Sequence, residues 1–168
     1  LGTAHAHRIV HRDLKPENIF LDADPAAPFG VQPKILDFGI AKILDPGIDA
    51  PQTRAGSIIG TPLYMSPEQC MAAPEIDHRA DLYALGAVTY EMLAGEPPFT
   101  GPNVQAIVAR LLAEEPRSLA AQRRAVPAGV ENAVMRALEK LPADRYSRAA
   151  EFAAALLVDA PAPVRSSG

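Results

Sequence analysis

The sequence predicts an α+β fold that is mostly α-helical and carries one short β-hairpin near its start. Two short runs flanked by turn residues predict the paired strands: Ile19-Phe20-Leu21 and Lys34-Ile35-Leu36. Helical patterns occupy the second half of the chain, and the most apolar of them spans Asp81 to Ala94. A hairpin followed by a series of helices is typical of the α+β class.

Length and composition fit a single globular domain. The chain has 168 residues, of which 48% are hydrophobic and 21% charged, and this suffices to bury a core. The net charge of −4 argues against a nucleic-acid binder, in which basic residues cluster. The single cysteine, Cys70, excludes an internal disulfide and fits a reducing compartment. No apolar run approaches the ~20 residues of a membrane helix, so we expect no membrane segment in this chain.

Two segments lack a periodic pattern. Residues 22–33 contain three prolines and a glycine and predict a loop between the strands. Residues 37–68 show no sustained apolar period, and stretches of this length in a compact domain are usually functional. At the end of this stretch a helix start is predicted, with Ser66 as N-cap, Pro67 at the first position and Gln69 completing a capping box.

The helices downstream differ in their surroundings. The helix over residues 81–94 is apolar on nearly every side, which indicates burial, and Gly95 ends it. Three amphipathic helices are predicted after it, over residues 102–113, 128–139 and 147–157. Residues 159–168 are rich in Pro, Ala and Ser and predict a disordered linker.

The strongest functional signal is the run His11-Arg12-Asp13-Leu14-Lys15-Pro16-Glu17-Asn18, followed after the second predicted strand by Asp37-Phe38-Gly39. A carboxylate such as that of Asp13 can orient an attacking hydroxyl and accept its proton. Asn18 and Asp37 carry the oxygen ligands that Mg²⁺ prefers. Because the strand pair between these two residues folds back on itself, their side chains can converge on one site.

With these motifs in order, the chain resembles the C-terminal lobe of a bacterial eukaryotic-like serine/threonine protein kinase. The resemblance covers residues 1–158 and rests also on Gly60-Thr61, Ser66-Pro67-Glu68, Asp81 with Gly86, and Arg145. It implies the mostly helical lobe of the protein-kinase fold and transfer of the ATP γ-phosphate to Ser or Thr hydroxyls of protein substrates, with ATP and Mg²⁺ (or Mn²⁺) as cofactors. It leaves open a dimer in which one copy phosphorylates the other.

The resemblance implies a catalytic role for several residues. Asp13 corresponds to the catalytic base, and Lys15 corresponds to the cation that touches the transferring phosphate. Thr61 corresponds to a hydroxyl that bridges these two and favours Ser/Thr acceptors. Asn18 and Asp37 correspond to metal ligands, and with Lys15 they contact the nucleotide. Taken singly, each would pass for a turn or surface residue.

Other residues are implied to act in the architecture. Glu68 and Arg145 are expected to form a buried ion pair, and Asp81 is expected to accept backbone hydrogen bonds from the His11–Arg12 loop. Further structural residues implied by the resemblance are His11, Phe38 and Gly39. An acid/base role for His11 does not follow from its residue type alone.

Two departures from the family pattern stand out. Residues 22–33 exceed the short turn usual between the two strands, so we expect a surface insertion. The N-terminal lobe is absent, with no glycine-rich loop, strand lysine or helix glutamate before His11. Because the chain begins with Leu1 and residues 1–8 read as the last turns of a helix, we expect a fragment that has little or no kinase activity alone.

Two alternatives to an enzyme of this class remain. A pseudokinase or truncated scaffold is compatible with the missing lobe, although Asp13, Asn18 and Asp37 are intact. A small-molecule phosphotransferase of related fold is disfavoured by Lys15, by Thr61 and by the Ser66-Pro67-Glu68 segment, which suit a peptide acceptor. We expect a cytoplasmic location, with anchoring of the parent protein through a membrane segment after Gly168 left open.

The resemblance also carries a regulatory hypothesis. Arg12 corresponds to an arginine that binds a phosphate on the activation segment, and its planar fork suits a bidentate contact. Thr53 and Ser57 are the hydroxyls in that segment that could carry the phosphate. We expect the full-length protein with both residues changed to Ala to lose activation in a phosphorylation assay. Full activity in that variant would contradict the hypothesis.

Overall fold

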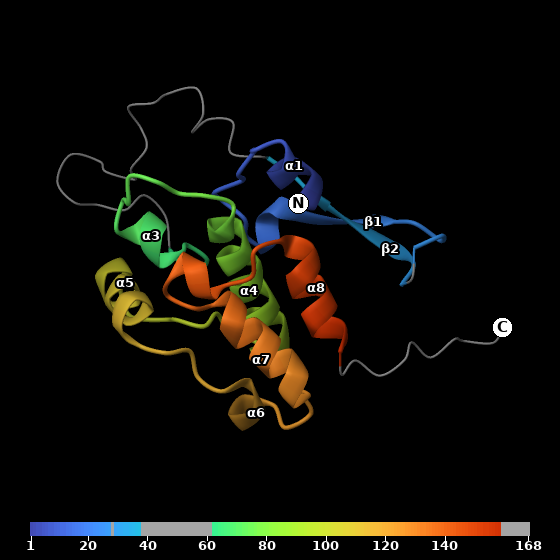
Figure 1. Ribbon diagram of the computed structural model, residues 1–168. Coiled ribbons are helices and arrows are strands. Elements are labelled where there is room, and N and C mark those ends of the chain that lie inside the picture. The colour runs from blue at the N-terminus through green and yellow to red at the C-terminus, as the bar shows by residue number, and fades with distance from the viewer. Residues whose placement is uncertain (28, 38–61, 159–168) are drawn as a thin grey trace.

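The computed structural model describes residues 1–27, 29–37 and 62–158 (Figure 1). Within these residues the β-hairpin projects beside α1 from a group of helices arranged around α4 (Figure 1). The elements in order are α1 (Gly2–Ala6), the 3₁₀ turn η1 (Pro16–Asn18), β1 (Ile19–Ala23), β2 (Val31–Ile35), α3 (Pro67–Cys70), α4 (Arg79–Ala94), α5 (Val104–Ala113), α6 (Leu119–Gln122), α7 (Ala128–Ala137), the 3₁₀ turn η2 (Pro142–Asp144) and α8 (Ala149–Leu157).

The two predicted strands pair antiparallel, but they are longer than the sequence indicated. The register runs from Ile19 opposite Ile35 to Ala23 opposite Val31. The prediction of a loop over residues 22–33 is therefore wrong at both ends, and the connecting loop is confined to residues 24–30. Pro33 is tolerated in β2 because a two-stranded sheet has outer edges at which no backbone donor is required.

Helix α4 forms the centre of the core, as its apolar sequence predicted. It begins two residues earlier than expected, at Arg79, and ends at Gly95, whose φ of 86° is left-handed. Its buried side chains contribute to two apolar clusters. One contains Tyr83, Ala87, Tyr90, Leu119, Val126, Val134 and Leu138, and the other contains Leu82, Ala133, Ala137, Tyr146 and Phe152. Helices α7 and α8 thus pack around α4.

The remaining helices deviate from the predicted bounds at their ends. Helix α5 begins at Val104 instead of residue 102, because the Asn103 side chain caps it by accepting the Ala106 N–H at 2.9 Å. Helix α7 ends two residues earlier than predicted, and α8 begins two residues later.

Helix α1 ends at Ala6, and the left-handed φ of 60° at Arg8 is incompatible with its continuation. The four-residue α6 was not predicted, because one turn is too short to show a period. The predicted linker, residues 159–168, lies outside the described residues.

Gly86 of α4 lies against Ala137 of α7. A Cβ at this position would lie 2.8 Å from the Cβ of Ala137. We expect Gly86→Ala to destabilise the domain by about 1–3 kcal/mol through overpacking, less the gain in helix propensity. Chemical denaturation measures this difference. Gly2→Ala is the matched control, since a Cβ there meets nothing within 4 Å. Equal stability of the Gly86→Ala variant and the wild type would contradict this packing.

Candidate active site

One buried carboxylate fixes the start of the His11–Asn18 loop. Asp81 lies in the first turn of α4 and is 1% exposed. It accepts the backbone N–H of His11 at Oδ2 and that of Arg12 at Oδ1, each at 2.8 Å. These are the contacts expected from the sequence. A third partner was not expected: His5 of α1 places its Nε2 2.8 Å from Asp81 Oδ2.

The backbone at Arg12 is strained. Its φ of 65° lies in the left-handed region, which is unfavourable for a residue with a Cβ. Two hydrogen bonds compensate for this strain. The Arg12 N–H donates to Asp81, and the Arg12 carbonyl accepts from the Gln69 side chain at 2.8 Å. The loop is thus attached to both α4 and α3.

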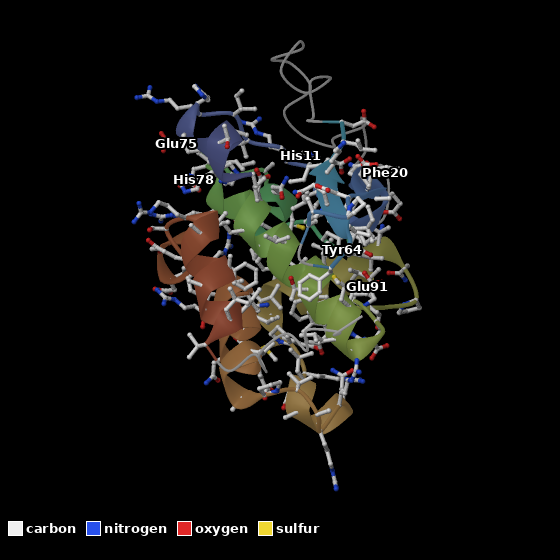
Figure 2. The ribbon with its side chains drawn as sticks, turned by 90° about the vertical axis from the view of Figure 1, so that its right-hand side faces the viewer. His11, Phe20, Tyr64, Glu75, His78 and Glu91 are labelled. Carbon is white, nitrogen blue, oxygen red and sulfur yellow. The ribbon has the colours of Figure 1, made fainter. Side chains whose placement is uncertain are left out.

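His11 is fully buried and has a structural function in this geometry (Figure 2). The Asp13 N–H donates to His11 Nδ1 at 3.3 Å, so that nitrogen carries a lone pair. The proton is then on Nε2, which donates to the Leu36 carbonyl at 2.9 Å. His11 therefore connects the loop to the residue that precedes Asp37.

The side chains of Asp13, Lys15 and Asn18 form one cluster. Lys15 Nζ lies 3.2 Å from Asp13 Oδ2, and the Asp13 side chain is 46% exposed. Asn18 Nδ2 donates to the Asp13 carbonyl at 2.8 Å and approaches Asp13 Oδ2 at 3.4 Å. A cavity of about 110 Å³ adjoins this cluster, with Asp13, Lys15 and Tyr64 in its wall. The carboxylate is therefore accessible and flanked by a cation and an amide.

The open end of the hairpin places Asp37 beside Asn18. The N–H of Leu36 donates to the Asn18 carbonyl at 2.9 Å, extending the strand ladder by one bond. Asp37 follows directly, with a φ of 50° and an exposed side chain. Asp37 is therefore the residue after the one that pairs with Asn18.

Sequence reasoning missed the pair Tyr64 and Glu91. The Tyr64 hydroxyl donates to Glu91 Oε2 at 2.6 Å (Figure 2). Burial and this bond raise the pKa of Tyr64 well above its usual value, so the hydroxyl stays protonated. No sequence pattern could indicate this pair, because Glu91 belongs to α4 and the contact arises only on folding.

Behind the site, Glu68 and Arg145 form the expected ion pair. Arg145 Nη1 and Nη2 lie 2.7 and 2.8 Å from the two Glu68 oxygens. The Arg145 side chain is completely buried and also donates to the carbonyls of Arg79, Glu139 and Lys140. The pair joins α3 to the segment before α8.

Helix α3 starts as predicted. It also contains Cys70, whose thiol is partly buried and unreactive. Pro67 is the first helical residue, and the Ser66 N–H donates to Gln69 Oε1 at 3.1 Å. Burial, and secondarily the charge of Glu68, raises the pKa of the Cys70 thiol to about 11. A thiol protonated at neutral pH is a poor nucleophile and metal ligand.

Five of the predicted site residues lie outside the described residues: Phe38, Gly39, Thr53, Ser57 and Thr61. Among residues 1–27, 29–37 and 62–158, no group of three or more His, Cys, Asp or Glu side chains could hold a metal ion. In the same ranges no helix is long and apolar enough to cross a membrane.

Comparison with known sequences identifies the family of this chain. The model of the protein kinase domain matches residues 1–158. This chain belongs to the protein kinase family. Among its relatives, serine/threonine-protein kinase Pkn1 of Myxococcus xanthus is 47% identical over 99% of this chain and 23% of the relative. Pkn3 of the same organism is 45% identical, over 93% and 28%, and PknB of Mycobacterium tuberculosis is 41% identical, over 94% and 24%. The chain spans about a quarter of the length of these curated relatives.

The Glu68–Arg145 pair gives a stability prediction for this kinase domain. Removal of one partner leaves the other charge buried, at a typical cost of about 3–5 kcal/mol. We expect Arg145→Met to cost more than Glu68→Gln, because three backbone carbonyls lose a donor as well. Urea denaturation of both variants measures the order. The control is Arg117→Met, which removes an exposed arginine 3.9 Å from Glu96. A Glu68→Gln loss as small as that of the control would contradict a buried pair.

Proposed function

We propose that this chain is the C-terminal lobe of a serine/threonine protein kinase that transfers the ATP γ-phosphate to protein hydroxyls. The observation that carries the proposal is the cluster of Asp13, Lys15 and Asn18, with Asp37 beside Asn18 across the hairpin. Membership of the protein kinase family and the serine/threonine-protein kinases among the relatives support it.

Asp13 is the proposed base of the reaction. Its carboxylate is half exposed, faces a cavity and is free to meet an incoming hydroxyl, which it would orient while accepting the proton. Lys15, 3.2 Å away, would offset the negative charge on the transferring phosphate. Thr61, outside the described residues, is proposed to bridge these two side chains.

The donor set suits Mg²⁺ and ATP. The amide nitrogen of Asn18 is used as a donor to Asp13, which leaves the amide oxygen as the ligand atom. With the carboxylate of Asp37 this makes two hard oxygen ligands, and Mg²⁺ commonly takes few protein ligands and completes its shell with water and phosphate. Bound magnesium supplies charge neutralisation at the phosphates.

Regulation and partners follow from the same proposal. Arg12 is held by its backbone next to Asp13, where its guanidinium could pair with a phosphate on Thr53 or Ser57. Protein substrates with Ser or Thr acceptors are the proposed partners, and one copy of the kinase is a candidate substrate of another. The glycine-rich loop, strand lysine and helix glutamate that would hold the ATP phosphates are proposed to come from polypeptide outside this chain. Residues 1–168 alone would then transfer little phosphate.

Asp13→Asn in the full-length protein tests the proposal. We expect kcat for phosphorylation of a generic basic protein to fall about 10²–10⁴-fold, since the base is lost while the side-chain shape is kept. Radiolabel transfer from ATP with Mg²⁺ measures it. The matched control is Asp24→Asn, in the hairpin loop, where an amide oxygen can still accept the Ala26 N–H. Undiminished activity of Asp13→Asn would refute the assignment, and wild-type rates from residues 1–168 alone would refute the need for further polypeptide.

A further inference from the structure

The amide of Gln69 connects the start of α3 to the loop that carries Asp13. Its Oε1 accepts the Ser66 N–H at 3.1 Å, and its Nε2 donates to the Arg12 carbonyl at 2.8 Å. Since a backbone N–H can only donate and a carbonyl can only accept, these two partners fix the amide in one orientation. Gln69 is 9% exposed, so both bonds are shielded from water.

Capping of α3 does not by itself explain a glutamine at this position. The capping box needs only an acceptor for the Ser66 N–H, and a glutamate would provide one. A carboxylate in the first turn would also interact favourably with the helix dipole. An ionised glutamate has no donor, however, so the bond from Nε2 to the Arg12 carbonyl is the contribution that only the amide can make.

The Arg12 carbonyl belongs to the peptide unit that leads into Asp13. A peptide unit is planar and includes the Cα atoms of both residues. Gln69 holds the oxygen of this unit, and the His11 ring accepts its N–H at 3.3 Å. The plane is therefore held at both ends, and its orientation helps to direct the Asp13 side chain. The left-handed φ of 65° at Arg12 is unfavourable, so the loop depends on such contacts to keep this orientation.

The other end of the connection lies beside the cavity at the proposed base. Tyr64 and Met65, which precede Ser66, line this cavity together with Asp13 and Gln69. A hydroxyl that enters the cavity would meet both the loop and the segment before α3. Because transfer requires the reacting groups in a defined geometry, the relative position of these two segments matters for the rate.

We propose that Gln69 is a positioning residue for phosphoryl transfer, acting through the Arg12 carbonyl on the carboxylate of Asp13. The inference rests on the proposed function. It requires a donor at the position of Nε2, so it distinguishes the amide from a carboxylate of nearly the same shape. A protonated carboxyl group has one O–H donor, which provides a test by pH.

The experiment compares Gln69→Glu and Gln69→Met in the full-length kinase. Glu keeps the acceptor for the Ser66 N–H and loses the donor to Arg12, whereas Met loses both. At about pH 8 we expect kcat to fall about tenfold in both variants, because orientation is lost. KM for ATP and for a basic protein substrate should stay unchanged, because binding is not affected. Amide hydrogen exchange at Asp13 should accelerate about tenfold in both variants.

A pH series separates loss of the donor from gain of a charge. Burial raises the pKa of a carboxyl group, so protonation of the Gln69→Glu variant restores a donor in mild acid. Its kcat relative to the wild type should rise from about one tenth at about pH 8 to about one half at about pH 5.5. Gln69→Met, which is neutral throughout, should show no such rise. Each comparison is made at equal pH, because ionisable groups nearby also titrate in the wild type: Arg12, Asp13, Lys15, Tyr64 and Asp81 line the same cavity, and Glu68 precedes Gln69.

Gln122→Glu is the matched control. It makes the same change at an exposed glutamine of α6, whose amide donates to the Tyr90 hydroxyl away from the loop. A hydroxyl can turn and donate to the carboxylate instead. We therefore expect this variant to match the wild type in kcat and in exchange at Asp13.

The outcomes separate the two proposals. Wild-type kcat in both Gln69 variants would overturn the positioning role, and so would a loss in Gln69→Glu that is independent of pH. A rise in KM for the protein substrate at constant kcat would overturn it too, because it would indicate a substrate contact. If Gln69→Met fails to fold, Gln69→Glu and its pH series still decide. If the wild type transfers no phosphate, the proposed function fails, whereas unchanged exchange at Asp13 in Gln69→Glu would refute the Gln69 inference separately.

Discussion

The structure of the site depends on one buried carboxylate. Asp81 is removed from water on the central helix, where an unsatisfied charge would be very unfavourable. Three donors satisfy it: the His5 ring and the N–H groups of His11 and Arg12. These bonds hold the loop in a conformation that it would not adopt alone, as the left-handed backbone of Arg12 shows. The geometry around Asp13 is therefore set by the core of the domain together with the contacts that Asp13 makes to His11, Lys15 and Asn18 within the loop.

The buried ion pair of Glu68 and Arg145 fixes the segment that ends in α3 in a similar way. Arg145 neutralises Glu68 and donates to three backbone carbonyls, so it links α3, α4 and the turn before α8. Gln69, next to Glu68, in turn donates to the Arg12 carbonyl. Buried Glu68, Gln69 and Arg145 thus also serve as connections between elements. In such a network, the loss of one member affects stability and site geometry together.

Much of the fold could be predicted because the signals were local. The apolar run of α4, its Gly95 terminus, the helix start at Ser66-Pro67 and the existence of the hairpin all depend on neighbouring residues. The predicted bounds of β2 and α5 were wrong because of single residues, Pro33 and Asn103. Pro33 reads as a loop residue, and only the position of β2 at a sheet edge makes it tolerable. Asn103 shifts the start of α5 because a side-chain cap outweighs a weak period.

By itself the sequence supplied the residues of the proposed site, a carboxylate, a lysine and two candidate oxygen ligands, in an order that resembles that of protein kinases. The contacts of Asp81 and Arg145 were also indicated by resemblance. Only the tertiary structure decided that His5 donates to Asp81, that Tyr64 pairs with Glu91, and that His11 connects the loop to Leu36. These partners are separated by 25 to 76 positions in the chain. No spacing rule brings them together, because Asp81 and Glu91 belong to α4 and Leu36 follows β2, and only the folded chain sets these elements beside their partners.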